Sequence, residues 1–391
     1  MSTHTAARHE FALHAAAQPA LPLLLKAGAV VRPMRKVPVL GWLVADAEVA
    51  RQIHNDSTHF SIVAPGASGH WWSQMLGEFV LNLFEGKPHH EFRAQVQDLF
   101  TMERSQAVLD RAVGPMLARL AEDLAAGATV DIADFARVYT GRIMVDLVGT
   151  RTDGSDDSYR HLFDTVERLA NLGIGTWKGT TVSARTARKG QALAAEIAKD
   201  VPQVYTDADP ATTIGRCREL GLSVADTAGL TTLLVVAGTA TLASTLGRMV
   251  ALLHDTGTHE RLVADPTLIP AAVRESLRVT SSMPIVGRGV TGDVEIAGHT
   301  LRRGDMVKIM TLSIDNELGG FDLDLGPVPQ LRQLWFGGGR HFCLGANLTH
   351  LELGGVLEAL VAAGRPWTIT KRSYRRNVFV PLYRQLDITL A

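Results

Sequence analysis

Cysteine is scarce in this chain, which has only Cys217 and Cys343 among 391 residues. Two cysteines cannot form the disulfide framework of a small secreted protein, so a reducing, cytoplasmic environment is expected. No CxxC pair occurs, which argues against a structural zinc site. Residues 1–19 also lack the basic start and apolar core of a secretory signal, and this supports the same cytoplasmic expectation.

An excess of charge of one sign is missing as well. Lysine and arginine total 39, aspartate and glutamate total 40, and the net charge is -1. Proteins that bind nucleic acid usually carry a basic excess, so no nucleic-acid partner is expected. No block of like charges indicates a tail for a polyanionic partner.

Charge is absent from residues 227–247, a run of 21 residues that is long enough to span a bilayer. Seven of these residues are Ser or Thr and three are Gly. Asp226 and Arg248 border the run directly, and no aromatic belt flanks it. We therefore predict a long helix buried in a protein core and no membrane partner, with membrane insertion as the minor alternative.

The remaining pattern favours one mainly α domain with small β-sheets. Residues 1–20, rich in Ala and His, predict a flexible N-terminal arm, and residues 21–391 a single folded domain without internal repeats. The expected helices are 46–54, several from about 88 to 205 with breaks near 153–157 and 173–179, 270–279, and about 344–363. The expected strands are Gly41–Val44, short hairpins in 284–312 and the last 25 residues, with loops at 61–88, 206–211 and 315–342.

The most informative segment is FGGGRHFCLG, residues 336–345. An irregular glycine-rich stretch brings one cysteine to the start of a helix, where free backbone N–H groups and the helix dipole favour a thiolate. From the residues alone, Cys343 is a nucleophile, a zinc ligand, a haem ligand or a buried small hydrophobe. A dinucleotide loop does not fit, because Phe342 occupies the third glycine position of GxGxxG.

These ten residues resemble the haem-binding loop of soluble bacterial cytochromes P450, FxxGx(H/R)xCxG, and match it at every defined position. The resemblance implies that Cys343 is the metal ligand to haem iron, that Phe336 packs near the sulfur, and that His341 contacts a haem propionate. A thiolate ligand pushes electron density toward iron and favours O–O cleavage. The resemblance runs from about residue 20 to the end, and implies the single-domain cytochrome P450 fold with heme b (iron protoporphyrin IX) as cofactor.

Further candidate cofactor contacts lie in KPHHEFR, residues 87–93. His89 and Arg93 are four residues apart, so they share one helix face and suit a carboxylate. The segment resembles the family's HxxxR helix, and Arg288 in PIVGRGV resembles another propionate-binding arginine. From the residues alone, a polar surface face remains open, and His90 competes with His89.

The uncharged run contains AGTAT, residues 237–241, which resembles the family's AGx(D/E)T segment. The resemblance implies that Gly238 leaves room for dioxygen and that Thr241 donates a hydrogen bond there. From the residues alone, a threonine in an apolar helix usually bonds its own backbone. Ala240 occupies the acidic position, so we expect protons to come instead from ordered water, Thr239, Thr245 or a polar group of the substrate.

Glu275 and Arg278 form an ExxR pair on one helix face, and a solvated surface pair is the simplest interpretation of the bare motif. The similar pair in the family is structural and is tied to the irregular segment before the cysteine. A departure lies at SIDNEL, residues 313–318, where the family's asparagine-arginine-aspartate pattern is poorly kept.

The resemblance implies a monooxygenase that activates O₂ and inserts one oxygen atom into a small organic substrate. Electrons would come from separate proteins, a ferredoxin and an NAD(P)H-dependent ferredoxin reductase. Two alternatives are haem-thiolate chemistry of another kind, such as oxidative coupling, cyclisation, isomerisation or peroxide-driven oxidation, and a haem sensor without turnover. The segments expected to line the substrate pocket are 71–75, 172–177, Leu234, 284–286 and 378–382.

Overall fold

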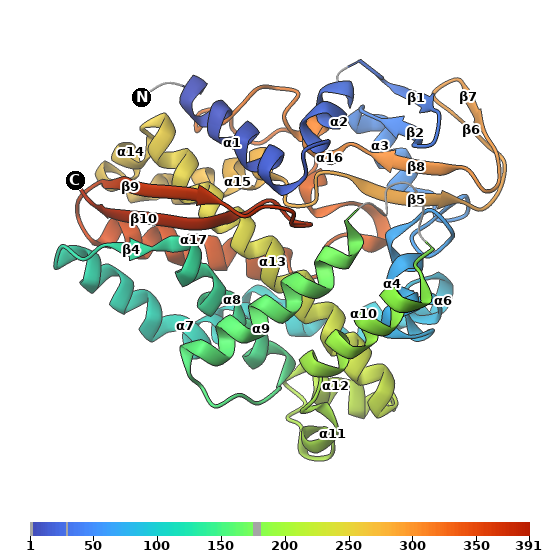
Figure 1. The fold of residues 1–391 in the computed structure, drawn as a ribbon, viewed down its shortest axis with the longest axis horizontal. Coiled ribbons are helices and arrows are strands. Elements are labelled where there is room, and N and C mark those ends of the chain that lie inside the picture. The colour runs from blue at the N-terminus through green and yellow to red at the C-terminus, as the bar shows by residue number, and fades with distance from the viewer. Residues whose placement is uncertain (1–2, 29, 175–180) are drawn as a thin grey trace.

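The computed structural model describes residues 3–28, 30–174 and 181–391. Helices make up most of these residues, and small sheets lie at the edges of the helical body (Figure 1). The N-terminal helices are α1 (Thr3–Ala17), α2 (Leu21–Gly28), α3 (Ala47–Asn55), α4 (Ser68–Leu76), α5 (Phe79–Leu83), α6 (Gly86–Val96), α7 (Met102–Ala125), α8 (Ile132–Val148) and α9 (Asp156–Ala170). They are followed by α10 (Ala184–Ile197), α11 (Val201–Val204), α12 (Thr213–Glu219), α13 (Val224–Thr256), α14 (Thr258–Ala264), α15 (Ile269–Thr280), α16 (Thr311–Asp315) and α17 (Ala346–Ala362).

Helix α13 is the core element of the fold and crosses the middle of the molecule (Figure 1). Its 33 residues begin after Ser223, whose side chain accepts a hydrogen bond from the backbone N–H of Asp226, and end at Gly257 in the left-handed conformation. Among the described helices α13 is long and apolar enough to cross a membrane, yet 72% of its most apolar window is buried inside the protein. The expected long core helix is therefore confirmed.

Three sheets form among the described residues. The five-stranded sheet has the order β1-β2-β8-β5-β3, the second has the order β4-β10-β9, and β6 pairs with β7. Their bounds are β1 (Met34–Val37), β2 (Gly41–Val44), β3 (Phe60–Ser61), β4 (Val130–Asp131), β5 (Val286–Val290), β6 (Val294–Ile296), β7 (His299–Leu301), β8 (Met306–Ile309), β9 (Trp367–Tyr374) and β10 (Tyr383–Leu390). The predicted short strands at Gly41–Val44, at 284–312 and near the C-terminus are confirmed.

The register of the five-stranded sheet decides which side chains reach the interior. Lys308 of β8 lies opposite Gly287 of β5 and opposite Leu43 of β2. Successive side chains of a strand point to opposite faces of the sheet. Lys308 and Gly287 therefore share one face, and Arg288 projects from the other.

The structure differs from the flexible arm expected for residues 1–20, because residues 3–17 form helix α1. Leu13 and Ala17 are fully buried, and α1 packs against α13. Glu10 forms an ion pair with Arg248 of α13, which is itself fully buried. Apolar contacts and this ion pair hold α1 in place, and an Ala-rich composition alone does not reveal them.

One predicted loop is wrong, and one helix was not predicted. Residues 61–88 contain α4, α5 and the start of α6, and Pro88 sits in the first turn of α6, where its missing N–H costs nothing. Residues 206–211 are followed by α12 before α13 begins. The predicted break at 173–179 falls partly on residues 175–180, which lie outside the described residues.

Candidate active site

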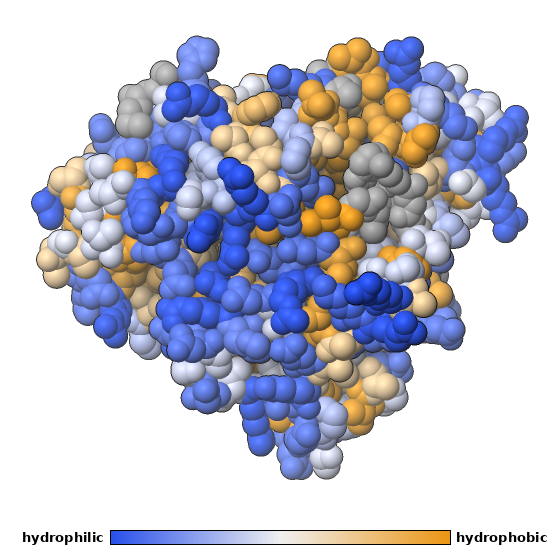
Figure 2. Space-filling view, in the orientation of Figure 1, coloured by the Kyte–Doolittle hydropathy of each residue, from blue (hydrophilic) through white to orange (hydrophobic). Residues whose placement is uncertain are grey.

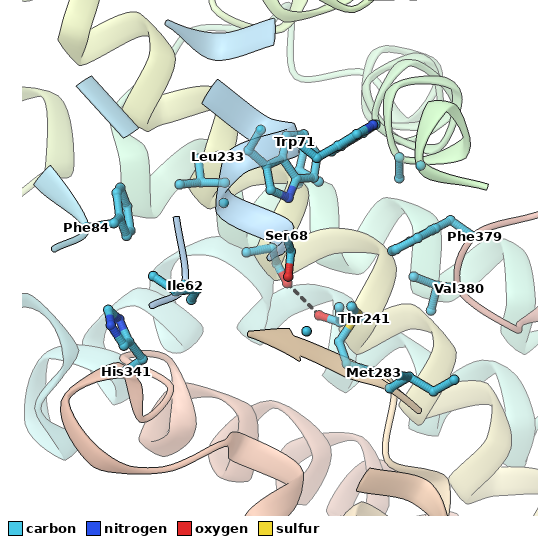
Figure 3. Close-up of a pocket in the computed structure, with 18 of the residues that line it drawn as sticks. Ile62, Ser68, Trp71, Phe84, Leu233, Thr241, Met283, His341, Phe379 and Val380 are labelled. Carbon is cyan, nitrogen blue, oxygen red and sulfur yellow. Dashed lines mark hydrogen bonds between the residues drawn. The ribbon is translucent and has the colours of Figure 1, made fainter. Parts of the chain in front are cut away.

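A cavity of about 740 Å³ lies inside the helical body, against α13 and the cysteine loop. Most of its wall is apolar, with leucine, valine, phenylalanine and tryptophan side chains. Figure 3 shows residues from distant parts of the chain converging on it, including Trp71, Thr241, His341 and Phe379. A pocket of this size and lining is typical of a site for a small ligand or cofactor.

Cys343 lies in the wall of this cavity. Its backbone N–H donates to the Phe336 carbonyl at 3.0 Å, which fixes the loop, and α17 begins three residues later at Ala346. The side chain is exposed to the cavity, and because the cavity lies inside the protein, desolvation raises the pKa of the Cys343 thiol. A backbone hydrogen bond from Gly345 and the charge of Arg93 act in the opposite direction and favour the thiolate.

His89, Arg93 and His341 line the same cavity, so α6 and the cysteine loop bring them together as predicted. The His89 and His341 rings lie 4.3 Å apart between centroids. Burial and neighbouring cations lower the pKa of His89 to about 4 and that of His341 to about 2. The Nδ1 atom of His89 is buried and has no hydrogen-bond partner among the described residues.

Arg288 lies behind this group, outside the lining of the cavity. It is 4% exposed, and its guanidinium lies 3.1 Å from Nδ1 of His54 and donates to the carbonyl of Gly287. Burial lowers the pKa of Arg288 to about 10, and its charge is among the causes that lower the pKa of His341. No local pattern identifies His54 as its partner, because the contact joins residues 234 positions apart.

The described residues that line the cavity include no Asp or Glu. The donor and cationic groups at its cysteine end therefore have no carboxylate to balance them, and one buried donor nitrogen has no partner. The half-buried Arg93 guanidinium needs a counter-charge, so this end of the cavity fits a ligand with carboxylates. Two propionates of a haem meet that requirement.

Helix α13 supplies another wall, where Ala237, Ala240 and Thr241 line the cavity. The Thr241 hydroxyl faces the cavity and donates to the Ala237 carbonyl one turn earlier (Figure 3). Gly238 is a correction, because it does not line the cavity: a Cβ there would lie 2.3 Å from Sδ of Met144 on α8. Its missing side chain lets α8 and α13 pack closely, and Ala237 takes the position facing the cavity.

Phe336 does not line the cavity either, but it supports the cysteine loop. Its ring packs edge-on against Phe342 and His350, with centroids 5.9 and 5.6 Å apart. Its carbonyl accepts the hydrogen bond from Cys343 described above. The predicted packing near the sulfur thus takes the form of backbone support and ring packing below the loop.

The predicted tie between the ExxR pair and the irregular segment is confirmed. Glu275 and Arg278 pair on α15 and are both 2% exposed at the side chain. Arg278 donates to the carbonyls of Asp315, Gly319 and Gly320, and a Glu275 oxygen accepts from the N–H of Asp322 at 2.9 Å. The pair therefore fastens the segment that leads toward the cysteine loop.

Most of the predicted pocket segments contribute to the wall, by Trp71, Trp72, Gly173, Leu234, Pro284, Ile285, Phe379 and Val380. Residues 175–177 of the predicted segment 172–177 lie outside the described residues. Sequence reasoning missed Lys308, which also lines the cavity. Its only sequence signal is a single lysine in the strand VKI, which does not distinguish an inward from an outward side chain.

Comparison of the sequence with curated proteins gives matches to cytochromes P450. A 20-oxo-5-O-mycaminosyltylactone 23-monooxygenase from Streptomyces fradiae is 38% identical over 165 residues, or 40% of this chain and 39% of that protein. Cytochrome P450 105A3 from Streptomyces carbophilus is 43% identical over 135 residues, and this chain spans 32% of its length. A C-19 steroid 1alpha-hydroxylase from Sorangium cellulosum is 28% identical over 304 residues, covering 72% of this chain and 73% of that protein. No family model matches the chain.

Solved structures share the fold across nearly the whole chain. A mutant of P450 EryK in complex with erythromycin B has a TM-score of 0.77 at 22% identity and covers 96% of this chain and 97% of that one. P450BioI in complex with a hexadec-9Z-enoic acid ligated acyl carrier protein has a TM-score of 0.77 at 21% identity, with coverage of 97% and 100%. The mainly α fold with small sheets is therefore the single-domain cytochrome P450 fold. Together with the cysteine loop on the cavity wall, the sequence matches and the shared fold support a bacterial-type cytochrome P450.

Proposed function

We propose that this protein is a haem-thiolate monooxygenase that inserts one oxygen atom of O₂ into a small organic substrate. The observation that carries the proposal is the placement of Cys343 and Thr241 on the wall of one apolar cavity, beside a group of donors without a carboxylate. Family membership implies a haem, and heme b is the form that we propose. When bound, it supplies the oxidising chemistry, while the protein provides binding, orientation and electrostatics.

The chain's own residues have separable roles in this proposal. Cys343 would hold the iron. The hydrogen bond from the Cys343 N–H to the Phe336 carbonyl fixes the position of the cysteine in the loop. His89, Arg93 and His341 hold the propionates from the cavity wall, and Arg288 supports them from behind with His54. The apolar side chains above exclude water and orient the substrate.

Electrons would come from separate redox proteins, which we propose to be a ferredoxin and its NAD(P)H-dependent reductase. We also propose that the protein is cytoplasmic and acts on a small organic molecule. The matched relatives are named as oxidising different molecules, a tylactone and a steroid, and those names do not point to one substrate for this chain.

The residues near Thr241 bear on how protons are supplied, because Ala240 stands where the family's AGx(D/E)T segment has an acidic residue. Thr239 and Thr245 are buried and do not line the cavity, and the Thr239 hydroxyl donates to the Val235 carbonyl of its own helix. With Ala240 at the helix position and no carboxylate in the described lining, water or a polar group of the substrate remains as the source. The Thr241 hydroxyl can pass such a proton on, since it faces the cavity.

The absence of a lining carboxylate favours a second candidate, a haem-thiolate enzyme driven by peroxide or performing coupling, cyclisation or isomerisation. A reaction that needs fewer delivered protons tolerates Ala240 better. Supplying hydrogen peroxide in place of O₂ and electron donors separates the two. Faster product formation with peroxide favours the second candidate, and product only with redox partners favours the first.

The metal ligand is tested by the reduced protein with carbon monoxide. Wild-type protein should give the far-shifted Soret band of a thiolate-ligated haem, and Cys343→Ser should lose it. Cys217→Ser is the matched control, because Cys217 is fully buried among apolar residues and burial raises its thiol pKa to about 11. A histidine-type spectrum from folded wild-type protein would overturn the proposal.

The proton route is tested by Thr241→Ala and Ala240→Glu on the same substrate. If the substrate's polar group supplies protons, Thr241→Ala changes product per electron pair little, and an analogue without that group turns over poorly. If water supplies them through Thr241, Thr241→Ala loses product and releases peroxide instead, and Ala240→Glu raises product per electron pair.

A further inference from the structure

Among the described residues that line the cavity, Lys308 is the charged side chain that the cofactor assignment does not use. It comes from β8, while the other ionisable lining residues, His89, Arg93, His341 and Cys343, come from α6 and the cysteine loop. His89, Arg93 and Arg288 are among the causes that lower the pKa of His341, and Lys308 is not. Lys308 thus reaches the cavity from a different element than the proposed propionate contacts.

The ammonium group of Lys308 is buried with little compensation. The residue is 5% exposed, and Nζ donates to the Leu40 carbonyl at 2.5 Å, in the connection between β1 and β2. An ammonium has three donors, so one carbonyl leaves capacity for further acceptors. Leu40 lines the cavity as well, which places both partners of this bond at its wall.

No carboxylate in the described residues balances this charge. Burial alone lowers the pKa of Lys308 to about 8, with no acidic group among the causes. The neighbouring strand β2 carries no titratable residue, and Arg288 on β5 projects from the opposite face toward His54. A lysine buried without an anion costs folding free energy, and a ligand that supplies the anion recovers that cost on binding.

We propose that Lys308 binds an anionic group of the substrate, a carboxylate on an otherwise apolar molecule. This assignment rests on the proposed function, because it takes the space not used by haem as the substrate site. Leu21, Leu24 and Leu40 line the cavity together with Lys308, so the carboxylate meets a single charge within an apolar wall. Lys308 is thus a specificity-determining residue rather than a catalytic one.

The surface near this strand also suits a ligand that is mainly apolar. Hydrophobic residues gather over α2 and the neighbouring β1–β2 hairpin (Figure 2). Leu23 and Val39 are 73% and 71% exposed, and they belong to the two segments that supply Leu21, Leu24 and Leu40 to the cavity. Apolar exposed groups beside an internal site are typical of a binding region for apolar molecules.

The test compares binding of matched ligands to the haem-loaded protein by calorimetry and by the Soret shift. Dodecanoate is paired with dodecan-1-ol, and biphenyl-4-carboxylate with biphenyl-4-methanol, so that each pair differs in charge. Variants are Lys308→Met, which removes the charge, and Lys308→Arg, which keeps it. Lys36→Met is the matched control, a half-exposed lysine of the same sheet whose Nζ lies 2.9 Å from Asp305.

Wild-type protein should bind at least one carboxylate about tenfold or more tightly than its alcohol, as expected for a charge-assisted hydrogen bond in an apolar wall. Lys308→Met should lose that preference while alcohol affinity stays within about twofold, and Lys308→Arg and Lys36→Met should retain it. An equal preference in wild type and Lys308→Met overturns the proposal, as does a wild type that binds no carboxylate better than its alcohol. Failure of the proposed function is seen separately, as loss of the thiolate-type carbon monoxide spectrum.

Discussion

Two groups of basic side chains inside this molecule differ in whether the protein supplies them with carboxylate partners. Behind the cysteine loop, Arg278 is paired with Glu275 and three backbone carbonyls, and neither side chain is more than 2% exposed. Around the cavity, His89, Arg93 and His341 have no carboxylate in the described lining. The first group is complete within the protein, and the second is complete only with a ligand.

The difference teaches how to read buried charge. A balanced buried pair stabilises the scaffold only as long as both partners are present, because removing one leaves the other uncompensated. An unbalanced group costs folding free energy, and proteins keep such groups where they bind something. The comparison is therefore testable by removing charge from each group and measuring stability and haem content separately.

The largest effect is expected for Arg278→Met. Loss of the guanidinium removes both Arg278 hydrogen bonds from the Glu275 carboxylate and the side-chain donor of three carbonyls, which should lower the free energy of unfolding by about 3–5 kcal/mol. Urea denaturation of the haem-loaded protein measures this. The control is Arg261→Met, whose exposed ion pair with Asp324 should contribute at most about 1 kcal/mol.

The expected cost of Arg278→Met is close to the total unfolding free energy of many domains, so this variant can fail to fold. The double variant Glu275→Gln/Arg278→Met is therefore measured beside it. Removing both charges should recover part of the loss. Equal costs for the Arg278 and Arg261 variants would show that the buried pair is not part of the scaffold.

An intermediate effect is expected for Arg93→Ala and Arg288→Ala, and it should appear in haem retention. Each lost charge-assisted bond should weaken haem binding by roughly 1.5–3 kcal/mol, about 10- to 150-fold in the dissociation constant. The stability of the haem-free protein should not fall to a matching degree, because no carboxylate lines the cavity beside Arg93 and the hydrogen bonds of Arg288 go to His54 and the Gly287 carbonyl rather than to a carboxylate. Transfer of haem to an apo-haem acceptor protein measures retention.

Normal haem retention in both arginine variants would break the comparison, because the unbalanced group would then have no ligand. An equal loss of unfolding free energy in the haem-free protein would also contradict the comparison, because these arginines would then stabilise the fold as Arg278 does. Arg104→Ala, a replacement on the exposed first turn of α7, is the control for general effects of removing a positive charge.

The smallest effect is expected in the acid dependence of stability. The folded pKa values of His89 and His341 lie below the usual 6.5, so in the haem-free protein the unfolded chain binds more protons as pH falls. Stability should therefore decrease below about pH 6.5, and for His89 the loss should continue to about pH 4, by about 1 kcal/mol after solvent screening.

Bound propionates should raise both histidine pKa values and make the haem-loaded protein less sensitive over the same range. Thermal unfolding at pH 7.0, 6.0 and 5.0 with and without haem measures the difference. The His89→Gln variant should flatten the haem-free curve. Equal acid sensitivity of the two forms would mean that these histidines do not face the propionates.

The sequence predicted the parts of the site that depend on local spacing. The cysteine loop carries its information within ten residues, and His89 and Arg93 share a face because α6 is a helix. The long core helix was also predictable, since a run without charge and with many small residues leaves burial as the favoured outcome.

The rest depended on contacts between distant segments. Gly238 faces Met144 rather than the cavity because of how α13 is rotated against α8, and a motif does not fix that rotation. Lys308 and the partnership of Arg288 with His54 follow from sheet register and long-range packing. The sequence predicts a loop in place of α4 because glycine and tryptophan are weak helix signals, yet Trp71 and Met75 are buried on the inner face of a helix there.

The ion pair between Glu10 and Arg248 makes α1 a structural support for α13, which the composition of α1 does not indicate. A chain shortened to begin after Ala17 would lose the counter-ion of a fully buried guanidinium in the C-terminal half of α13. It would also uncover the α13 surface that Leu13 and Ala17 now seal. Trimming this terminus to aid crystallisation or expression would therefore unsettle α13, the helix on which the cavity wall depends.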